Sequence, residues 1–200
     1  MTMTGKPRGT YAKTAGRRRE ILEAGIEVFS AGGFRSGSIR EIAERVGMSQ
    51  AGLLHHFANK NELLAAVLEL RDDQSREYTG NQGDGLTTIR GLIRLVEHNS
   101  RVPGLVELHT TLSAEATAPD HPAHDYFVRR YAYVTGFITT AFEQIQSDGN
   151  LAPGIDPASA SRSVTALMDG LQVQWLLDRN SVDMAEETRT FVRRLITVEL

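Results

Sequence analysis

Two short stretches of this 200-residue sequence carry side chains whose types and spacing suit binding chemistry. The first, SIREIAERVGMSQAGLLHHFANK at residues 38–60, contains Arg40 and Gln50. A guanidinium group hydrogen-bonds well to guanine and a carboxamide to adenine, so both side chains are candidates for reading bases in DNA. The second is an H-x-x-H-D run that begins at His121 and contains the imidazole and carboxylate groups that zinc accepts.

The His121, His124 and Asp125 side chains would hold zinc if they converged at a helix start. However, Pro122 disturbs the local helix, and a catalytic zinc helix usually presents two histidines four residues apart with a glutamate between them. The sequence contains no phosphate-binding glycine loop, nucleophile elbow or pair of catalytic carboxylates. A metal-dependent helical enzyme stays open as an alternative, but we expect no enzyme activity, no bound metal and no cofactor.

The elements that position the first stretch are two short helices. Ser38 and Glu41 form an S-x-x-E capping box, which predicts a helix start at Ser38. The apolar side chains of this first helix recur at helical spacing, at Ile39, Ile42, Ala43 and Val46. Gly47 suits the position past a helix end, and Ser49 is suited to cap a second helix through Phe57. Helices joined by so short a turn cross steeply, as in a helix-turn-helix that presents its second helix to the major groove.

The same pattern alone also fits a helix corner with no role in DNA binding, so the flanking sequence matters. Upstream, an amphipathic helix is expected to end at Gly32 and Gly33. Downstream, Asn59 with Glu62 begins a further helix. The runs RRREILEAGIEVFSAGGF, SIREIAERVGMSQAGLLHHF and NKNELL together resemble the tetracycline-repressor (TetR) family of bacterial transcriptional regulators, over about residues 17–68. A looser resemblance, in MDGLQVQWLL, is to the penultimate helix of many members.

The resemblance implies that the second helix of this unit faces DNA and that neighbouring residues contact phosphates. The residues expected at DNA are Arg17, Arg18, Arg19, Ser38, Arg40, Ser49, Gln50, Ala51, Gly52, Leu54, His55, His56 and Lys60. Gly52 and Leu54 depart from the family, which usually has threonine and tyrosine there to donate hydroxyl groups to the DNA backbone. We therefore expect fewer hydroxyl contacts and greater reliance on Gln50, Arg40, Lys60 and the basic N-terminal arm.

Charge is distributed unevenly along the chain, whose formal net charge is −3. Residues 1–20 carry six basic and one acidic side chain, a balance of +5, whereas residues 21–70 and 71–200 sum to −2 and −6. The basic residues thus lie beside the helix-turn-helix, where they suit phosphate binding with a steep salt dependence. We expect residues 1–16 to form a flexible basic arm, because this Pro-, Gly- and Thr-rich stretch cannot bury a core. A merely solvated tail is the alternative.

Helices separated by proline and glycine are predicted beyond residue 85. They are expected at Leu86–Asn99, from Pro103 to before Pro119, at His124–Gln146, at Pro157–Leu177 and at Asp183–Val198. No strand pattern or internal repeat competes, so the predicted fold is all-α, with a three-helix helix-turn-helix head joined by a fourth helix to a larger helical body. We place the DNA-binding domain at residues 17–62 and the effector-binding and dimerisation domain at residues 63–200.

The composition bounds the environment of the protein. With no cysteine, the chain forms neither disulfides nor a cysteine-based zinc finger, which favours a reducing compartment. Neither a signal-peptide run nor a membrane-spanning apolar stretch occurs in the sequence. We therefore expect a cytoplasmic protein that does not contact membranes.

The last two predicted helices carry more apolar side chains than one short helix pair buries alone. The TetR resemblance implies a homodimer through a four-helix bundle, and the residues expected in the interface are Val164, Leu167, Gly170, Leu171, Phe191, Leu195 and Val198. Packing within the subunit is the alternative. A two-fold dimer reads a palindromic operator in double-stranded DNA, with recognition helices about 34 Å apart or a multiple of that distance.

Family members commonly hold a small-molecule effector in the helical body. The candidate effector contacts are Leu108, His109, Leu112, Phe127, Tyr131, Met168, Gln172 and Trp175, each of which also suits an ordinary core. We expect a repressor that is released when an effector favours a head spacing that mismatches the operator. A helical interaction module without DNA binding is a further alternative, but it does not explain the basic arm beside the helix-turn-helix.

Overall fold

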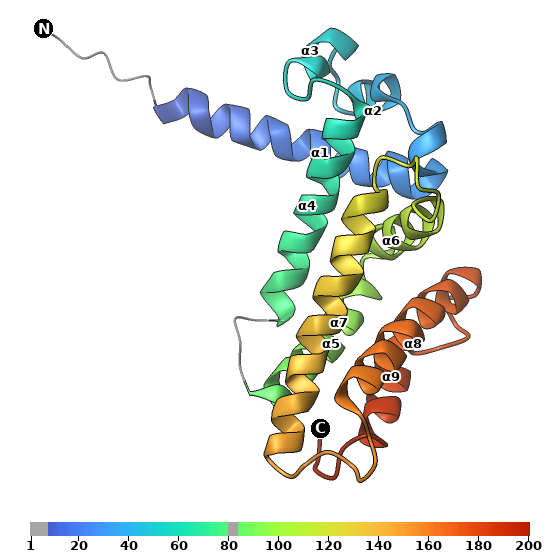
Figure 1. The fold of residues 1–200 in the computed structure, drawn as a ribbon. Coiled ribbons are helices and arrows are strands. Elements are labelled where there is room, and N and C mark those ends of the chain that lie inside the picture. The colour runs from blue at the N-terminus through green and yellow to red at the C-terminus, as the bar shows by residue number, and fades with distance from the viewer. Residues whose placement is uncertain (1–7, 80–83) are drawn as a thin grey trace, which may run out of the picture.

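The computed structural model describes residues 8–79 and 84–200, and within these ranges the chain folds into nine α-helices without a β-strand (Figure 1). The helices are α1 (Arg8–Ser36), α2 (Ile39–Arg45), α3 (Gln50–Leu54), α4 (Lys60–Thr79), α5 (Gly85–Asn99), α6 (Pro103–Glu115), α7 (His124–Ser147), α8 (Pro157–Leu177) and α9 (Met184–Arg193). The predicted all-α fold class is confirmed. None of the helices in the described ranges is long and apolar enough to cross a bilayer.

The predicted caps of the helix-turn-helix are present. Ser38 Oγ accepts a hydrogen bond from the Glu41 amide at 3.1 Å, and Ser49 Oγ accepts one from the Gly52 amide at 3.0 Å. Gly47 adopts a φ of +65° in the turn between α2 and α3, a conformation that glycine reaches without steric cost. Local sequence signals therefore account for the start of both helices and for the turn that joins them.

Two predicted helices end earlier than expected. The second helix of the unit was expected to reach Phe57, but α3 ends at Leu54 because the chain turns there and buries the Phe57 ring in the core. α9 ends at Arg193 instead of Val198, because the chain beyond it pairs with the loop after α7. There an isolated antiparallel bridge joins Leu151 to Ile196.

The arm expected over residues 1–16 is corrected in part. α1 already begins at Arg8, so residues 8–16 are helical, and Figure 1 shows these first turns projecting away from the rest of the head. Lys6 and its neighbours in residues 1–7 lie outside the described residues. The basic segment beside the helix-turn-helix is thus largely an extension of α1.

Two hydrophobic cores are stacked along the molecule. The first is formed by α1 to α4 together with buried side chains of α6 and the start of α7. The second is formed by α5 to α9. The expected domain boundary at residue 62 falls inside α4, whose Leu63, Leu64, Val67 and Leu68 are buried in the first core. α4 therefore leaves the head as an unbroken helix and continues into the body (Figure 1).

A second link between head and body forms at Gly33, where α1 is interrupted by a residue with φ +70° and ψ −179°. This break turns the Phe34 amide toward α6, where it donates a 2.8 Å hydrogen bond to Glu115 Oε2. A Cβ atom at Gly33 would lie 2.1 Å from Glu115 Oε1, so only glycine fits this approach. The Glu115 carboxylate, at the end of α6, thereby holds the end of α1.

Gly33→Ala is expected to lower the free energy of unfolding by about 2 kcal/mol, because this φ/ψ region is almost restricted to glycine and the Glu115 contact must move. Urea denaturation monitored by circular dichroism measures the change. Gly16→Ala is the matched control, because an added Cβ at this α1 position has no described atom within 4 Å and favours the helix. Equal stabilities of the two variants would contradict the expectation.

Candidate functional site

The outward face of α3 consists of residues expected to contact DNA. Gln50, Ala51, Leu54 and His55 are exposed, whereas Leu53 is fully buried against the head. Gly52 and His56, also expected at DNA, are partly buried. Figure 1 shows α3 at the end of the molecule farthest from α9. The first core therefore orients α3 so that its polar side chains face solvent.

The neighbouring helix adds a cation to this face. Arg40 in α2 is exposed, and its nearest charged partner is Glu44, with Nε 3.6 Å from Oε1. An exposed ion pair of this kind contributes little to stability, so the guanidinium is available to another acceptor. Ser38 and Ser49 use their hydroxyl oxygens as acceptors for the caps, which leaves each O–H free to donate.

The three consecutive arginines in α1 have different roles. Arg17 Nη2 donates a 2.7 Å hydrogen bond to the Val46 carbonyl at the end of α2. The Arg18 guanidinium lies 4.2 Å from the centroid of the Phe57 ring. Arg19 is exposed and pairs with Glu23 at 2.9 Å. Arg17 and Arg18 thus hold α1 against the helix-turn-helix, and Arg19 projects from its surface.

Lys60, the other expected phosphate ligand, begins α4 and is partly buried. Its Nζ lies 4.3 Å from the centroid of the Phe34 ring and 3.4 Å from the Arg35 carbonyl oxygen. Burial lowers the pKa of this ammonium group below its usual value. Lys60 therefore stabilises the junction between α1 and α4 in addition to adding positive charge beside the head.

The histidine cluster is committed to protein contacts. His121 Nε2 lies 3.3 Å from Glu115 Oε2, and its Nδ1 accepts from the Ala123 amide. His124 Nδ1 donates to the Ala116 carbonyl at 2.8 Å. Within residues 8–79 and 84–200, no group of three or more histidine, aspartate or glutamate side chains is arranged to hold a metal ion. The geometry does not support the metal-dependent alternative.

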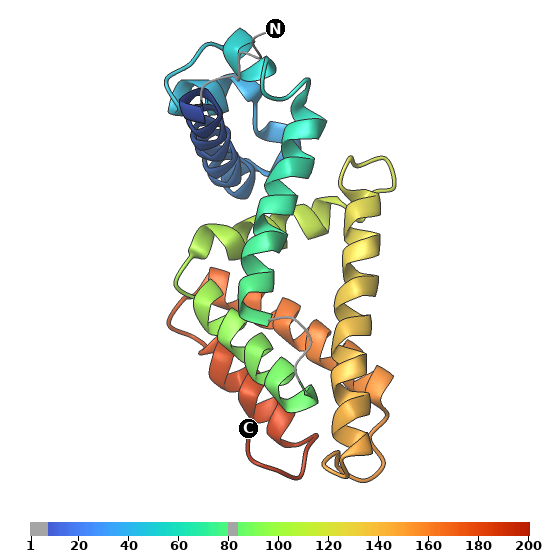
Figure 2. The same ribbon diagram turned by 90° about the vertical axis from the view of Figure 1, so that its left-hand side faces the viewer.

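A cavity of about 360 Å³ lies in the body between α4, α5, α6, α7 and α8. Figure 2 shows α4 and α7 on either side of this region, with α6 crossing between them at the head end. Four of the expected effector contacts line the cavity: His109, Tyr131, Met168 and Gln172. This volume is at the lower end of the usual range for ligand pockets, about 300–1,000 Å³.

The other four expected effector contacts are core residues. Leu108, Leu112 and Phe127 are buried in the first core, where α6 and α7 pack against the head. Trp175 is buried in the second core and lies under the Arg179 guanidinium. The assignment of these four side chains to the effector site is therefore corrected to a structural role. Helical periodicity predicts that they are buried but does not predict which core they fill.

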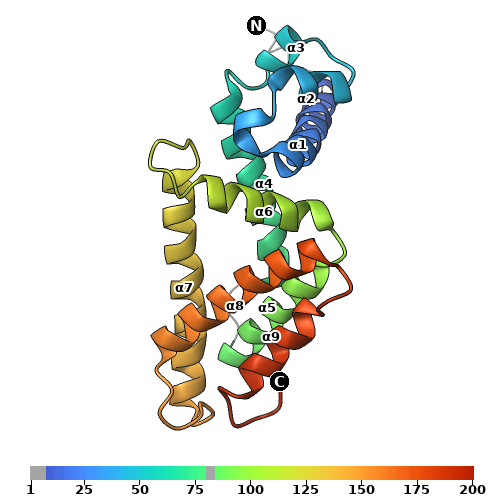
Figure 3. The same cartoon turned by 90° about the vertical axis from the view of Figure 1, so that its right-hand side faces the viewer.

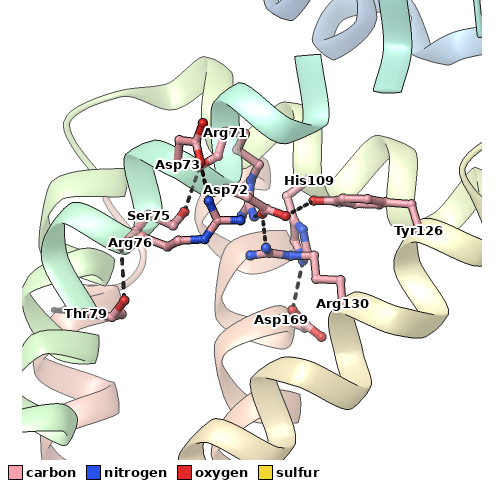
Figure 4. Close-up of polar contacts among 10 residues, drawn as sticks. All are labelled: Arg71, Asp72, Asp73, Ser75, Arg76, Thr79, His109, Tyr126, Arg130 and Asp169. Atoms are coloured by element: carbon pink, nitrogen blue, oxygen red, sulfur yellow. Dashed lines mark hydrogen bonds and ion pairs between the residues drawn. The ribbon is translucent and has the colours of Figure 1, made fainter. Parts of the chain in front are cut away.

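Buried and partly buried polar side chains converge on the cavity from four helices (Figure 4). On α8, Asp169 accepts from His109 Nε2 at 3.2 Å and from the Tyr131 hydroxyl at 2.7 Å. On α4, Asp72 accepts from the Tyr126 hydroxyl at 2.8 Å and also bonds Arg130 of α7. Both carboxylates that line the cavity therefore have protein donors.

Burial fixes the protonation states around these carboxylates. It lowers the pKa of His109 to about 4, helped by the nearby positive charge of Arg71, so the imidazole is neutral at pH 7. Burial also lowers the pKa of Arg71 to about 10, which leaves the guanidinium charged. Because desolvation disfavours the phenolate, the pKa of Tyr126 is raised to about 12. At neutral pH the phenol and imidazole thus act as donors to the two carboxylates.

The polar residues of the cavity wall that were not predicted from the sequence include Arg71, Asp72, Tyr126, Arg130 and Asp169. One signal was available for Arg71, which lies four residues after Val67 and seven after Leu64, on the buried face of α4. A charged residue at a core position of a helix indicates a buried polar site. The other four carry no such signal, since their convergence depends on how α4, α7 and α8 pack.

The structure corrects part of the expected dimer interface. Val164, Leu171 and Leu195 are buried in the subunit's own second core, so they have no surface left for a second copy. Leu167, Phe191 and Val198 pack against that core and are partly buried. The outer face of α8 instead carries Ala166, Gly170, Val173 and Leu177, which are exposed and follow helical spacing. We refer to these four residues as the α8 stripe.

Two family models match the chain. The model described as bacterial regulatory proteins, tetR family, matches residues 21–67, and the model of the C-terminal part of BetI-type transcriptional repressors matches residues 100–200. The chain belongs to the TetR family. It is therefore a helix-turn-helix transcriptional regulator.

Individual relatives agree with this membership. The HTH-type transcriptional regulator UidR of Escherichia coli (strain K12) is 25% identical over 171 residues, which cover 85% of each chain. The HTH-type transcriptional repressor KstR2 of Rhodococcus jostii (strain RHA1) is 27% identical over 158 residues, 78% of this chain and 74% of that protein. A solved TetR-family regulator from Rhodococcus sp. is 25% identical with a TM-score of 0.75, and the match covers 92% of this chain and all of the other.

The stability of this TetR-family protein is expected to fall below pH 6.5 because of His109. Its imidazole has a pKa of about 4 in the folded state against 6.5 in the unfolded chain, so the unfolded state binds more protons between these values. The contribution of His109 to the free energy of unfolding is complete above pH 6.5. It is lost as pH falls toward 4, by up to about 3 kcal/mol. Urea denaturation from pH 7.5 to 4 measures it. His109→Gln should lose less stability over this interval, and parallel curves would contradict the assignment.

Proposed function

We propose that this TetR-family regulator is a repressor that binds a palindromic operator as a homodimer and releases it when a small molecule fills the cavity. The observation that carries the proposal is the course of α4. This helix begins at Lys60 beside α3 and brings Arg71 and Asp72 to the cavity wall. A ligand in the cavity therefore contacts the helix that positions the DNA-binding head.

The 20 residues of α4 form a rigid connection about 30 Å long. Its first turns are anchored in the head by Leu63 and Leu64, and Asp72 is held by Tyr126 and Arg130 of α7. A ligand that displaces these cavity contacts favours a different position of α4 and thereby a different spacing of the two heads. Coupling between two such sites is typically about 1–3 kcal/mol, which corresponds to a change of about 5- to 150-fold in operator affinity.

Three observations support a dimer through α8 and α9. Val173 and Leu177 on the α8 stripe are 46% and 84% exposed, although such apolar side chains usually avoid water when they lie together. Gly170, within the same stripe, allows a second helix to approach closely. Figure 3 shows α8 and α9 together on one side of the body, so both helices are accessible to a second copy. A two-fold axis through this side pairs each stripe with its equivalent.

Gly170→Leu is expected to weaken the dimer by at least about tenfold, because the new side chain separates the paired helices. The subunit itself should remain folded, since an added Cβ at Gly170 meets no described atom within 4 Å. Sedimentation equilibrium measures the dissociation constant. Gly136→Leu on α7 is the matched control, because this glycine is also helical, exposed and open around its Cβ. A dimer equally stable in both variants would contradict the interface.

Operator recognition is tested on bound genomic sites by footprinting, which should protect two symmetric half-sites with centres about 34 Å apart or a multiple of it. Gln50→Ala should lower the preference for the operator over a scrambled duplex by about tenfold, because one good base contact contributes about 1–3 kcal/mol. Arg19→Ala should weaken binding to both duplexes alike, since this exposed cation suits phosphate contact. A footprint without dyad symmetry would exclude the proposed dimer on DNA.

A further inference from the structure

Arg71 lines the cavity with hydrogen-bond donors that are not used. The residue is 6% exposed, and its buried Nε and Nη1 atoms have no hydrogen-bond partner among the described residues. Its nearest carboxylate is that of Asp72, with Oδ1 3.7 Å from Nη1, beyond hydrogen-bonding distance. A buried guanidinium without hydrogen bonds is costly, so this side chain requires an acceptor that the folded chain does not supply.

The carboxylates of the cavity, unlike the Arg71 guanidinium, already have hydrogen-bond partners. Asp72 already accepts from Tyr126 and Arg130, and both oxygens of Asp169 already accept from His109 and Tyr131. A cationic ligand would have to share these carboxylates with the donors already bonded to them. An anionic ligand would instead satisfy Arg71 without breaking an existing hydrogen bond, and the charge-assisted bonds it formed would be stronger than neutral ones.

The count of charges on the cavity wall also favours an anion. Arginines 71, 76, 129 and 130 line the cavity, against the two aspartates 72 and 169, and the neutral imidazole of His109 adds no charge. Arg130 is occupied by Asp72, and the exposed Arg76 is bonded to Asp73 outside the cavity. With Arg76 offset by Asp73, arginines 71, 129 and 130 against the two aspartates leave a net charge of +1 on the wall, which a singly charged anion neutralises and a doubly charged phosphate would exceed.

The rest of the wall fits an apolar body. The apolar and aromatic side chains that line the cavity come from α5, α7 and α8 and include Leu92, Leu95, Tyr133, Val134, Phe137 and Met168. A volume of about 360 Å³ suits a compact molecule. The cavity thus offers one charge-binding group at α4 and an apolar surface opposite it.

We propose that the cavity binds a small organic monocarboxylate, whose carboxylate accepts hydrogen bonds from Arg71 and whose apolar or aromatic body packs against α5 and α7. This inference rests on the proposed function, since it assigns a chemical class to the effector. Arg71 lost its water on folding, so a carboxylate restores hydrogen bonds at little further desolvation cost to the protein. The ligand is then anchored on the helix that carries the DNA-binding head.

Three probes with the same phenylpropyl body test the charge preference on the full-length protein. They are 3-phenylpropanoate, 3-phenylpropanamide and 3-phenylpropylamine, and isothermal titration calorimetry at pH 7 measures their affinities. The acid is expected to bind at least about tenfold more tightly than the amide, because hydrogen bonds between charged groups are about twice as strong as neutral ones. The amine should bind most weakly. Amide or amine binding as tight as that of the acid would overturn the proposal.

Arg71→Met tests the anchoring residue, because methionine keeps most of the side-chain volume and removes the charge. The variant should lose about tenfold in affinity for the acid and retain its affinity for the amide. Arg76→Met is the matched control, because it removes an exposed arginine from the cavity wall that is bonded to Asp73. Wild-type affinity for the acid in Arg71→Met would overturn the assignment. If Arg71→Met does not fold, the comparison of the acid with the amide on the wild-type protein decides.

Operator binding with and without the acid separates this proposal from the proposed function. If the acid binds and the operator affinity is unchanged, the chemical class of the ligand stands and release by that ligand is wrong. If only the neutral or cationic probe releases the operator, release stands and the carboxylate assignment is wrong. Release by the acid from the wild type, with a tenfold higher concentration required for Arg71→Met, would support both.

Discussion

The whole arrangement depends on α4 being one continuous helix that is packed at both ends. Its N-terminal turns bury leucine and valine side chains in the head, and two turns further on the same helix presents Arg71 and Asp72 to the cavity. An α-helix resists bending because its backbone hydrogen bonds are all internal. Contacts made at the cavity are therefore mechanically connected to α3, although the two sites share no residues. The Glu115 contact with α1 adds a second connection between head and body.

Cations in this protein are used for internal structure as well as for binding. Arg17 and Arg18 close the end of α2 and cover Phe57, so they stabilise the head that presents α3. Arg71 differs, because burial removes its water while its Nε and Nη1 donors stay unused. In a medium of low dielectric constant an unsatisfied charge is costly, and such groups occur mostly where a function retains them. These arginines therefore show that a positive charge in the sequence does not by itself distinguish a binding residue from a structural one.

Much of the fold could be predicted from the sequence, because helix starts and ends depend on neighbouring residues. Such local features include the Ser38 and Ser49 caps, the positive φ of Gly47, and Pro157 at the start of α8. The predictions were wrong where a distant contact decided the outcome. α3 ends early so that Phe57 is buried, and α9 ends early because residues beyond it pair with the loop after α7. Neither contact has a signature in the local sequence.

The sequence by itself determined the all-α class, the helix-turn-helix and its exposed Gln50, because capping, glycine turns and helical periodicity operate over a few residues. Only the tertiary structure decided which polar side chains share the cavity and which apolar ones face solvent on α8. Periodicity assigns a residue to one face of a helix, but whether that face meets the core, a cavity or water depends on the helices packed around it. Val164 and Val173 lie on the same helix, one inside the second core and one on the α8 stripe, for that reason.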